Sequence, residues 1–140
     1  MSDKLHRLAR MHGIASEYRD VWDTTHRVTD GTLRTLLSAM GIDAATETAL
    51  DHALHATMQT RWQRTMDAAT VVREGAAEFS IALRFPERFG GAALDWRIVA
   101  EDGREWAATF DAVALRCGAR AEIDGVAYVV RELRLRVGAP

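Results

Sequence analysis

Residues 78–86, Glu-Phe-Ser-Ile-Ala-Leu-Arg-Phe-Pro, decide the fold class of the second half of the chain. Large apolar side chains occupy every second position from 79 to 85, with polar or small residues between them. This period of two places the apolar side chains on one face of an extended strand. Pro86 ends the strand, because proline has no N–H to donate to a neighbouring strand. The apolar face requires a partner layer, so this stretch predicts a packed β-sheet.

The same period recurs toward the C-terminus and predicts an antiparallel immunoglobulin-like β-sandwich over residues 67–140. Asp102-Gly103 and Asp124-Gly125 each lie between two alternating stretches. Asp-Gly accepts the positive φ of a type I′ turn, so both pairs indicate hairpins. Including two short candidates, six to eight strands are expected. Beyond the strand at 78–86, these lie at 70–73, 94–98, 106–110, 113–117, 121–123, 126–130 and 133–137.

The N-terminal half has a helical period and predicts a small bundle of about three helices over residues 1–66. Ser2 and Asp3 can cap the first helix, and Gly13 suits its end. Thr29 is a good N-cap for the second helix, which Gly41 ends. A third helix is expected to start near residues 43–46. The expected core positions of the three helices are Leu5, Leu8 and Ala9; Leu33, Leu36, Leu37 and Met40; and Leu50, Leu54, Met58 and Trp62. The chain is therefore expected to have an α+β fold.

Two aromatic residues stand outside these periodic patterns. Tyr18 and Trp22 lie in the segment 14–28, which is expected to be an irregular loop between the first two helices. They can either fill the core or the space between subdomains, or stack on a ligand such as a sugar. Packing is the favoured interpretation. Trp96 and Trp106 are in phase with strand positions, so a core role is expected for both.

Composition excludes several classes of protein. The chain has 140 residues, 48% of them hydrophobic, and a formal net charge of −2. A real core is therefore expected, and a dedicated nucleic-acid binder is not, because no basic stripe could follow phosphates. Cys117 is the single cysteine, which excludes an internal disulfide. With no long apolar run, the sequence predicts no membrane partner and a cytoplasmic location.

The residues by themselves indicate no catalytic centre and no cofactor. His52 and His55, three apart beside Asp51, make a surface metal site conceivable, but solvent-facing histidines are the favoured interpretation. The acidic pairs near Asp102 and Asp124 lie in expected turns, where water surrounds them. No Gly-x-Ser-x-Gly motif is present, and Cys117 is expected to be a small buried hydrophobe in a strand. A non-catalytic globular module without a metal is the prediction.

The N-terminal half resembles the opening of bacterial 4-alpha-glucanotransferases of the amylomaltase type. The resemblance covers residues 5–42 well and extends more loosely through the hairpin at 96–103 to residues 128–135. It departs from the family at Asp23, where the family often has glycine after the tryptophan. The residues that carry it are Leu5-x-x-Leu8-Ala9, Gly13-Ile14, Tyr18-x-Asp20-x-Trp22 and Val28-x-Asp30-x-Thr32-Leu33-x-x-Leu36-Leu37-x-x-Met40-Gly41.

The resemblance implies a function for the parent protein rather than for this segment alone. In that family a helical segment and a β-sandwich precede a catalytic (β/α)₈ barrel, which moves α-1,4-glucan segments between maltodextrins. The family's catalytic Asp and Glu residues lie in the barrel, so none falls on this chain. The segment is therefore expected to be inactive alone and to support or orient a barrel of the same parent chain. Tyr18, Asp20 and Trp22 are the candidate contacts to substrate or barrel, and maltodextrin is a possible partner. The alternative is a stand-alone carbohydrate- or protein-binding module.

Overall fold

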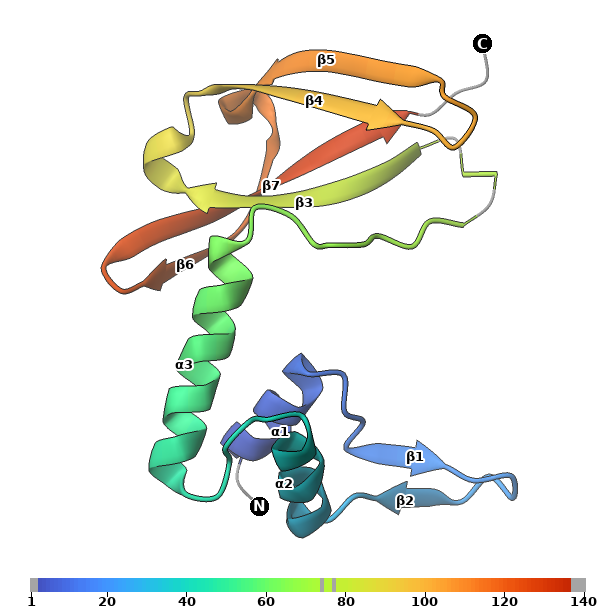
Figure 1. Cartoon of the computed structure of the whole chain (residues 1–140), viewed down its shortest axis with the longest axis vertical. Helices are drawn as coiled ribbons and strands as arrows, with labels where there is room; N and C mark the ends of the chain where they lie inside the picture. The colour runs from blue at the N-terminus through green and yellow to red at the C-terminus, as the bar shows by residue number, and fades with distance from the viewer. Residues whose placement is uncertain (1–2, 74, 77, 137–140) are drawn as a thin grey trace. The chain divides into compact units, whose positions relative to one another are not determined.

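The α+β class expected from the sequence is confirmed by a computed structural model, which describes residues 3–73, 75–76 and 78–136. The chain divides into two units, residues 1–61 and 62–140. Three helices and a short hairpin lie in the first unit, with the last turn of the third helix crossing into the second; antiparallel strands form the second unit (Figure 1). Among the helices of the described residues, none is long and apolar enough to cross a membrane.

The three expected helices form where the sequence places their ends. They are α1 (Asp3–Met11), α2 (Asp30–Ala39) and α3 (Glu47–Gln63). The hydroxyl of Thr29 accepts the N–H of Thr32 at 3.2 Å and so caps α2. Glycines with φ near +77°, at 13 and 41, follow α1 and α2 in the left-handed conformation that commonly ends a helix. Ser2 lies outside the described residues.

The core of the first unit is small and aliphatic. Residues of all three helices contribute to it, and most of them are fully buried. The predicted stripe of α2 is half right, because Leu36 and Met40 are 42% and 53% exposed whereas Leu33 and Leu37 are buried. The buried members are Leu5, Leu8, Ala9, Leu33, Leu37, Ala44 and Leu50.

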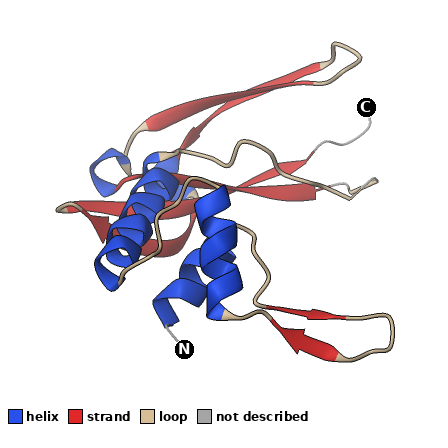
Figure 2. Cartoon of the chain, turned by 60° about the horizontal axis from the view of Figure 1, so that its bottom comes forward, coloured by secondary structure: helices blue, strands red, loops and turns tan. Residues whose placement is uncertain are grey.

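A β-hairpin replaces the irregular loop expected at 14–28. Its strands are β1 (Glu17–Arg19) and β2 (Thr25–Arg27), paired antiparallel with Tyr18 opposite His26. Both views show this ribbon extending away from the helices of its unit (Figures 1 and 2). Strands of three residues give no detectable alternation, and this is why the period was not visible in the sequence.

Five strands in two sheets make up the described part of the second unit. The order in the first sheet is β3-β7-β6, with β3 (Glu78–Pro86), β7 (Val126–Arg136) and β6 (Arg116–Ile123) all antiparallel. The second sheet is the hairpin of β4 (Ala93–Val99) and β5 (Glu105–Asp111). It lies over one face of the first sheet (Figure 1), and apolar side chains of both sheets pack in one cluster. The buried members of this cluster are Leu83, Phe85, Ala112, Val129, Leu133 and Leu135, with Leu94, Trp96, Ile98 and Phe110 packed against them.

The two Asp-Gly hairpins are confirmed, but their turns differ. Asp124 and Gly125 both have positive φ, +51° and +74°, as a type I′ turn requires. In the other hairpin only Gly103 does, and the N–H of Ala100 donates to the carbonyl of Arg104 at 2.8 Å, so this loop is wider.

One predicted short strand is wrong and the other is right only in part. Residues 70–73 form no strand. Of the stretch 113–117, residues 113 and 114 lie in a 3-10 helix, η2 (Ala112–Ala114), whereas 116 and 117 begin β6. A second 3-10 helix, η1 (Glu87–Phe89), follows β3. The stretches expected at 126–130 and 133–137 form one continuous strand, β7, so the described part of the second unit has five strands rather than six to eight. Val137, expected in the last strand, lies outside the described residues.

Arg84 is one of the polar residues that alternate with the apolar positions of β3, but it does not lie in solvent. Its side chain is buried, 6% exposed, and its guanidinium donates to both oxygens of Asp67 at 2.9 and 3.2 Å. The N–H of Arg84 also donates to the carbonyl of Thr65 at 2.6 Å. The segment that follows α3 is thus held against β3 by a bidentate ion pair and a backbone bond.

Leu37→Ala should lower the free energy of unfolding by about 2–5 kcal/mol, because it leaves a cavity among buried leucines. Leu36→Ala is the matched control. Because Leu36 is partly exposed, its truncation should lower the free energy of unfolding by about 1 kcal/mol or less. Urea unfolding followed by helical circular dichroism measures both. Equal losses in the two variants would contradict the assigned face of α2.

Arg84→Ala should cost about 1–3 kcal/mol, because it removes a buried, charge-assisted donor pair. Arg97→Ala, which removes an exposed ion pair with Glu105 at 3.8 Å, should cost less than about 0.5 kcal/mol. Thermal unfolding of both variants beside the parent chain tests this. An Arg84 variant as stable as the Arg97 variant would show that the ion pair between Arg84 and Asp67 contributes nothing to stability.

Candidate functional site

The carboxylate of Asp20 organises the tip of the β1–β2 hairpin. Its Oδ1 accepts the backbone N–H groups of Trp22 and Thr24, each at 2.9 Å. Its Oδ2 lies 2.8 Å from Nε2 of His26, on the opposite strand. The backbone N–H of Asp20 also donates to the carbonyl of Thr24 at 3.0 Å. One side chain therefore closes the turn and joins it to β2.

Asp23 takes the conformation that glycine would take most easily. Its φ is +66°, in the left-handed region that Asp and Asn tolerate better than other L residues. The side chain then accepts from Arg19 Nη1 at 2.8 Å across the base of the turn. Asp23 is the position where the amylomaltase-type family often has glycine. The departure is thus accommodated by the backbone, and an ion pair is added.

The aromatic side chains of this hairpin are exposed, so the core-filling role expected for Tyr18 and Trp22 is wrong. Tyr18, Val21 and Trp22 are 59%, 89% and 80% exposed. The ring of Tyr18 stacks on the ring of His26, with centroids 5.2 Å apart and planes 21° apart. We call residues 18–26 the aromatic hairpin. It brings the three candidate residues Tyr18, Asp20 and Trp22 onto one small ordered element. In this element Asp20 holds the backbone of the turn, and the two aromatic side chains are exposed.

The pKa of the Asp20 carboxyl is lowered from its usual 3.8. The largest cause is the hydrogen bond with His26, followed by the N–H of Thr24; partial desolvation opposes them, and the N–H of Trp22 contributes last. Each donor favours the ionised form, so the charged carboxylate and the closed turn stabilise each other.

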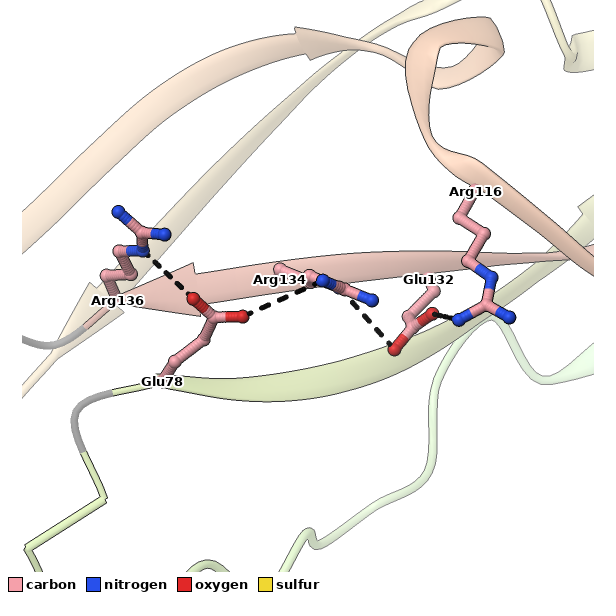
Figure 3. A network of polar contacts seen from close by, with 5 residues as sticks. All are labelled: Glu78, Arg116, Glu132, Arg134 and Arg136. Carbon is pink, nitrogen blue, oxygen red and sulfur yellow. Dashed lines mark hydrogen bonds and ion pairs between the residues drawn. The ribbon is translucent and has the colours of Figure 1, made fainter.

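A second polar cluster lies on the outer face of the β3-β7-β6 sheet. Glu78 lies between two arginines, 2.9 Å from Arg136 Nε and 4.0 Å from Arg134 Nη1. Glu132 in turn lies 3.8 Å from Arg134 Nε and 3.5 Å from Arg116 Nη1 (Figure 3). Charges of both signs alternate along this row. The row holds three arginines and two glutamates, so most of its charge is paired within the sheet face and only a small positive excess remains.

The other candidate groups have structural roles. Asp102 accepts the N–H of Arg104 at 3.0 Å within its turn, and Asp111 accepts the N–H of Val113 at 3.0 Å and caps η2. Cys117, expected to be buried, is exposed next to a β-bulge. His52 and His55 are exposed as expected. Within the described ranges no three His, Cys, Asp or Glu side chains gather as a metal site.

A groove of about 620 Å³ runs along α3 in the first unit. Its walls are mainly small side chains such as Ala49, Ala53 and Ala56. Asp43 and His52 are its only ionisable lining residues among those described. The groove therefore offers little for chemistry, and the aromatic hairpin is the better candidate for a functional site.

The fold and the aromatic hairpin define an α+β module with an ordered hairpin that carries exposed aromatic side chains. No family model matches the chain. It is 34% identical over 104 residues to the 4-alpha-glucanotransferases of Mycobacterium bovis and Mycobacterium tuberculosis, a match that covers 74% of this chain and 14% of each relative. In structure it is similar to amylomaltase from Corynebacterium glutamicum, with a TM-score of 0.68 and 23% identity over 98% of this chain and 19% of that one.

The resemblance seen in the sequence is thereby confirmed. The chain is related to the N-terminal region of 4-alpha-glucanotransferases of the amylomaltase type. It spans about one seventh of the length of the curated relatives it matches.

Acid should open the aromatic hairpin. Because the folded-state pKa of Asp20 lies below 3.8, its contribution to hairpin stability is present above pH 3.8 and is lost as the pH falls through the lower folded value. In NMR spectra the amide signals of Trp22 and Thr24 should move toward unfolded positions over that range. Asp20→Asn keeps an acceptor for both amides but loses the charge that pairs with His26, so its shifts should be less dependent on pH. Amide signals of the parent chain that stay constant down to the lowest pH would contradict the role of Asp20.

Proposed function

We infer that this chain serves as a non-catalytic N-terminal region of a 4-alpha-glucanotransferase, and that it supports or orients a catalytic (β/α)₈ barrel. The parent protein would transfer α-1,4-glucan segments between maltodextrins. The observation that carries this proposal is the match itself: nearly the whole fold corresponds to a part of a much longer amylomaltase. The barrel of the parent chain is then the principal partner, with maltodextrin as a possible second.

The roles of the acidic side chains support a structural function. A glycosidase needs two carboxyl groups in different environments a short distance apart, one as acid and one as nucleophile or base. Here Asp20, Asp102 and Asp111 accept backbone N–H groups in turns, whereas Glu78 and Glu132 lie in the row of alternating charges on the sheet. These carboxylates are used to hold the backbone and to balance charge.

Two further proposals concern the type of β-fold in the second unit and the location of the protein in the cell. We propose that the second unit is an immunoglobulin-like β-sandwich, because its two sheets share one apolar cluster. We also propose a cytoplasmic location, since the single cysteine gives no disulfide framework of the kind that secreted domains use.

A stand-alone carbohydrate- or protein-binding module is the second candidate function. The exposed side chains of Tyr18 and Trp22 favour it, because large aromatic residues on a surface commonly mark a contact site. In either case these two residues are the proposed contacts to substrate or partner, and Asp20 is the residue that positions them.

The chain alone should leave maltotriose unchanged, and it should restore activity to a barrel that lacks its own N-terminal region. The test uses the Mycobacterium tuberculosis relative with the matching segment deleted, with and without this chain, and measures glucose released from maltotriose. The expected result is release only in the mixture, accompanied by a complex in gel filtration. Glucose release by the chain alone would overturn the non-catalytic assignment. A mixture that forms no complex and is no more active than the deleted enzyme would overturn the supporting role.

A further inference from the structure

Trp22 differs from the other three tryptophans of the chain. Trp62 is buried against Tyr128, with ring centroids 6.3 Å apart, and Trp96 and Trp106 are partly buried on the β4–β5 hairpin. Trp22 is 80% exposed, beside an equally exposed Val21. Holding an indole in water forgoes the free energy that its burial would give, so its exposure on an ordered turn marks a contact surface.

The turn that carries Trp22 is fixed before any ligand binds. The backbone N–H of Trp22 is tied to Asp20 at 2.9 Å, and Arg19 and Asp23 close the base of the turn at 2.8 Å. A side chain on such a turn loses little conformational entropy on binding, so even a small contact can give measurable affinity.

The size of this surface favours a small ligand. A stable protein–protein interface takes about 800 Å² and about 20–30 residues from each partner. The tip consists of only residues 20–24, and Trp22 is its one aromatic side chain. One exposed indole is enough, however, to cover one face of a sugar ring.

The neighbouring side chains suit a ligand with both apolar and polar faces. The paired groups of Arg19 and Asp23 are largely exposed, as is Thr24, so they can exchange hydrogen bonds with hydroxyl groups beside the indole. A pyranose presents C–H bonds on its ring faces and hydroxyls around its edge. We propose that the aromatic hairpin is a stacking site for a linear α-1,4-linked glucan, with Trp22 as the platform and Tyr18 as a second one; the choice of this glucan rests on the proposed function.

The test is a titration of the intact 140-residue chain with maltoheptaose, followed by the NMR signals of the four indole N–H groups. The Trp22 signal should shift saturably with millimolar affinity, and the buried Trp62 signal should stay in place. Trp22→Ala should weaken binding about tenfold or more, because it removes the stacking surface. Val21→Ala, which removes an equally exposed but non-aromatic side chain of the same turn, should bind like the parent chain. The signals of Trp62, Trp96 and Trp106 report whether each variant is folded.

Three outcomes would overturn the proposal. They are an unmoved Trp22 signal at saturating sugar, equal weakening by the Val21 and Trp22 variants, and equal binding of the β-1,4-linked cellohexaose. None of these outcomes decides the test of the supporting role, because that test measures glucose release by the mixture and not the binding of glucan. Conversely, glucan binding by a chain that neither binds nor activates the barrel would overturn the proposed supporting role and favour a separate binding module.

Discussion

Burial of a small number of aliphatic side chains is the constraint on which both units depend. In units of about 60 to 80 residues the ratio of surface to volume leaves room for only one thin core each. Leucines of three helices fill the first, and residues of two sheets fill the second. Nearly every large apolar position with a clear period is used in this way. The residues left over, above all Trp22, are therefore the ones whose exposure requires an explanation.

Hydrogen bonds and ion pairs fix the position of segments that apolar burial alone does not hold in one place. In the second unit, Arg84 and Asp67 fix the segment after α3 against a strand, at a place where hydrophobic packing alone would leave it free to slide. In the first unit, Asp20 defines a turn that has almost no apolar contact to hold it. In both cases a carboxylate gathers several donors, which makes the geometry specific although the net stabilisation is modest.

Much of the fold could be predicted because the hydrophobic period and the residues that end helices or form turns are local signals. Thr29, Gly13 and Gly41 mark helix ends, and Asp124-Gly125 marks a type I′ turn, through conformational preferences that act within a few residues. The strand expected at 70–73 failed because a short run of β-branched residues forms a strand only when a sheet edge is available to pair with it. The candidate residues Tyr18, Asp20 and Trp22 could be selected, but neither the hairpin that joins them nor their exposure could be foreseen.

The sequence by itself determined which segments are helical or extended and where most of them end, because those choices depend on side-chain period and backbone preference along the chain. Only the tertiary structure decided burial where a distant segment provides the cover. Trp62 follows the stripe of α3 yet packs on Tyr128 of β7, and Arg84 follows a polar strand face yet is covered by residues 65–67. These contacts join positions from 17 to 66 residues apart, and no local pattern encodes which distant segment will cover a given face.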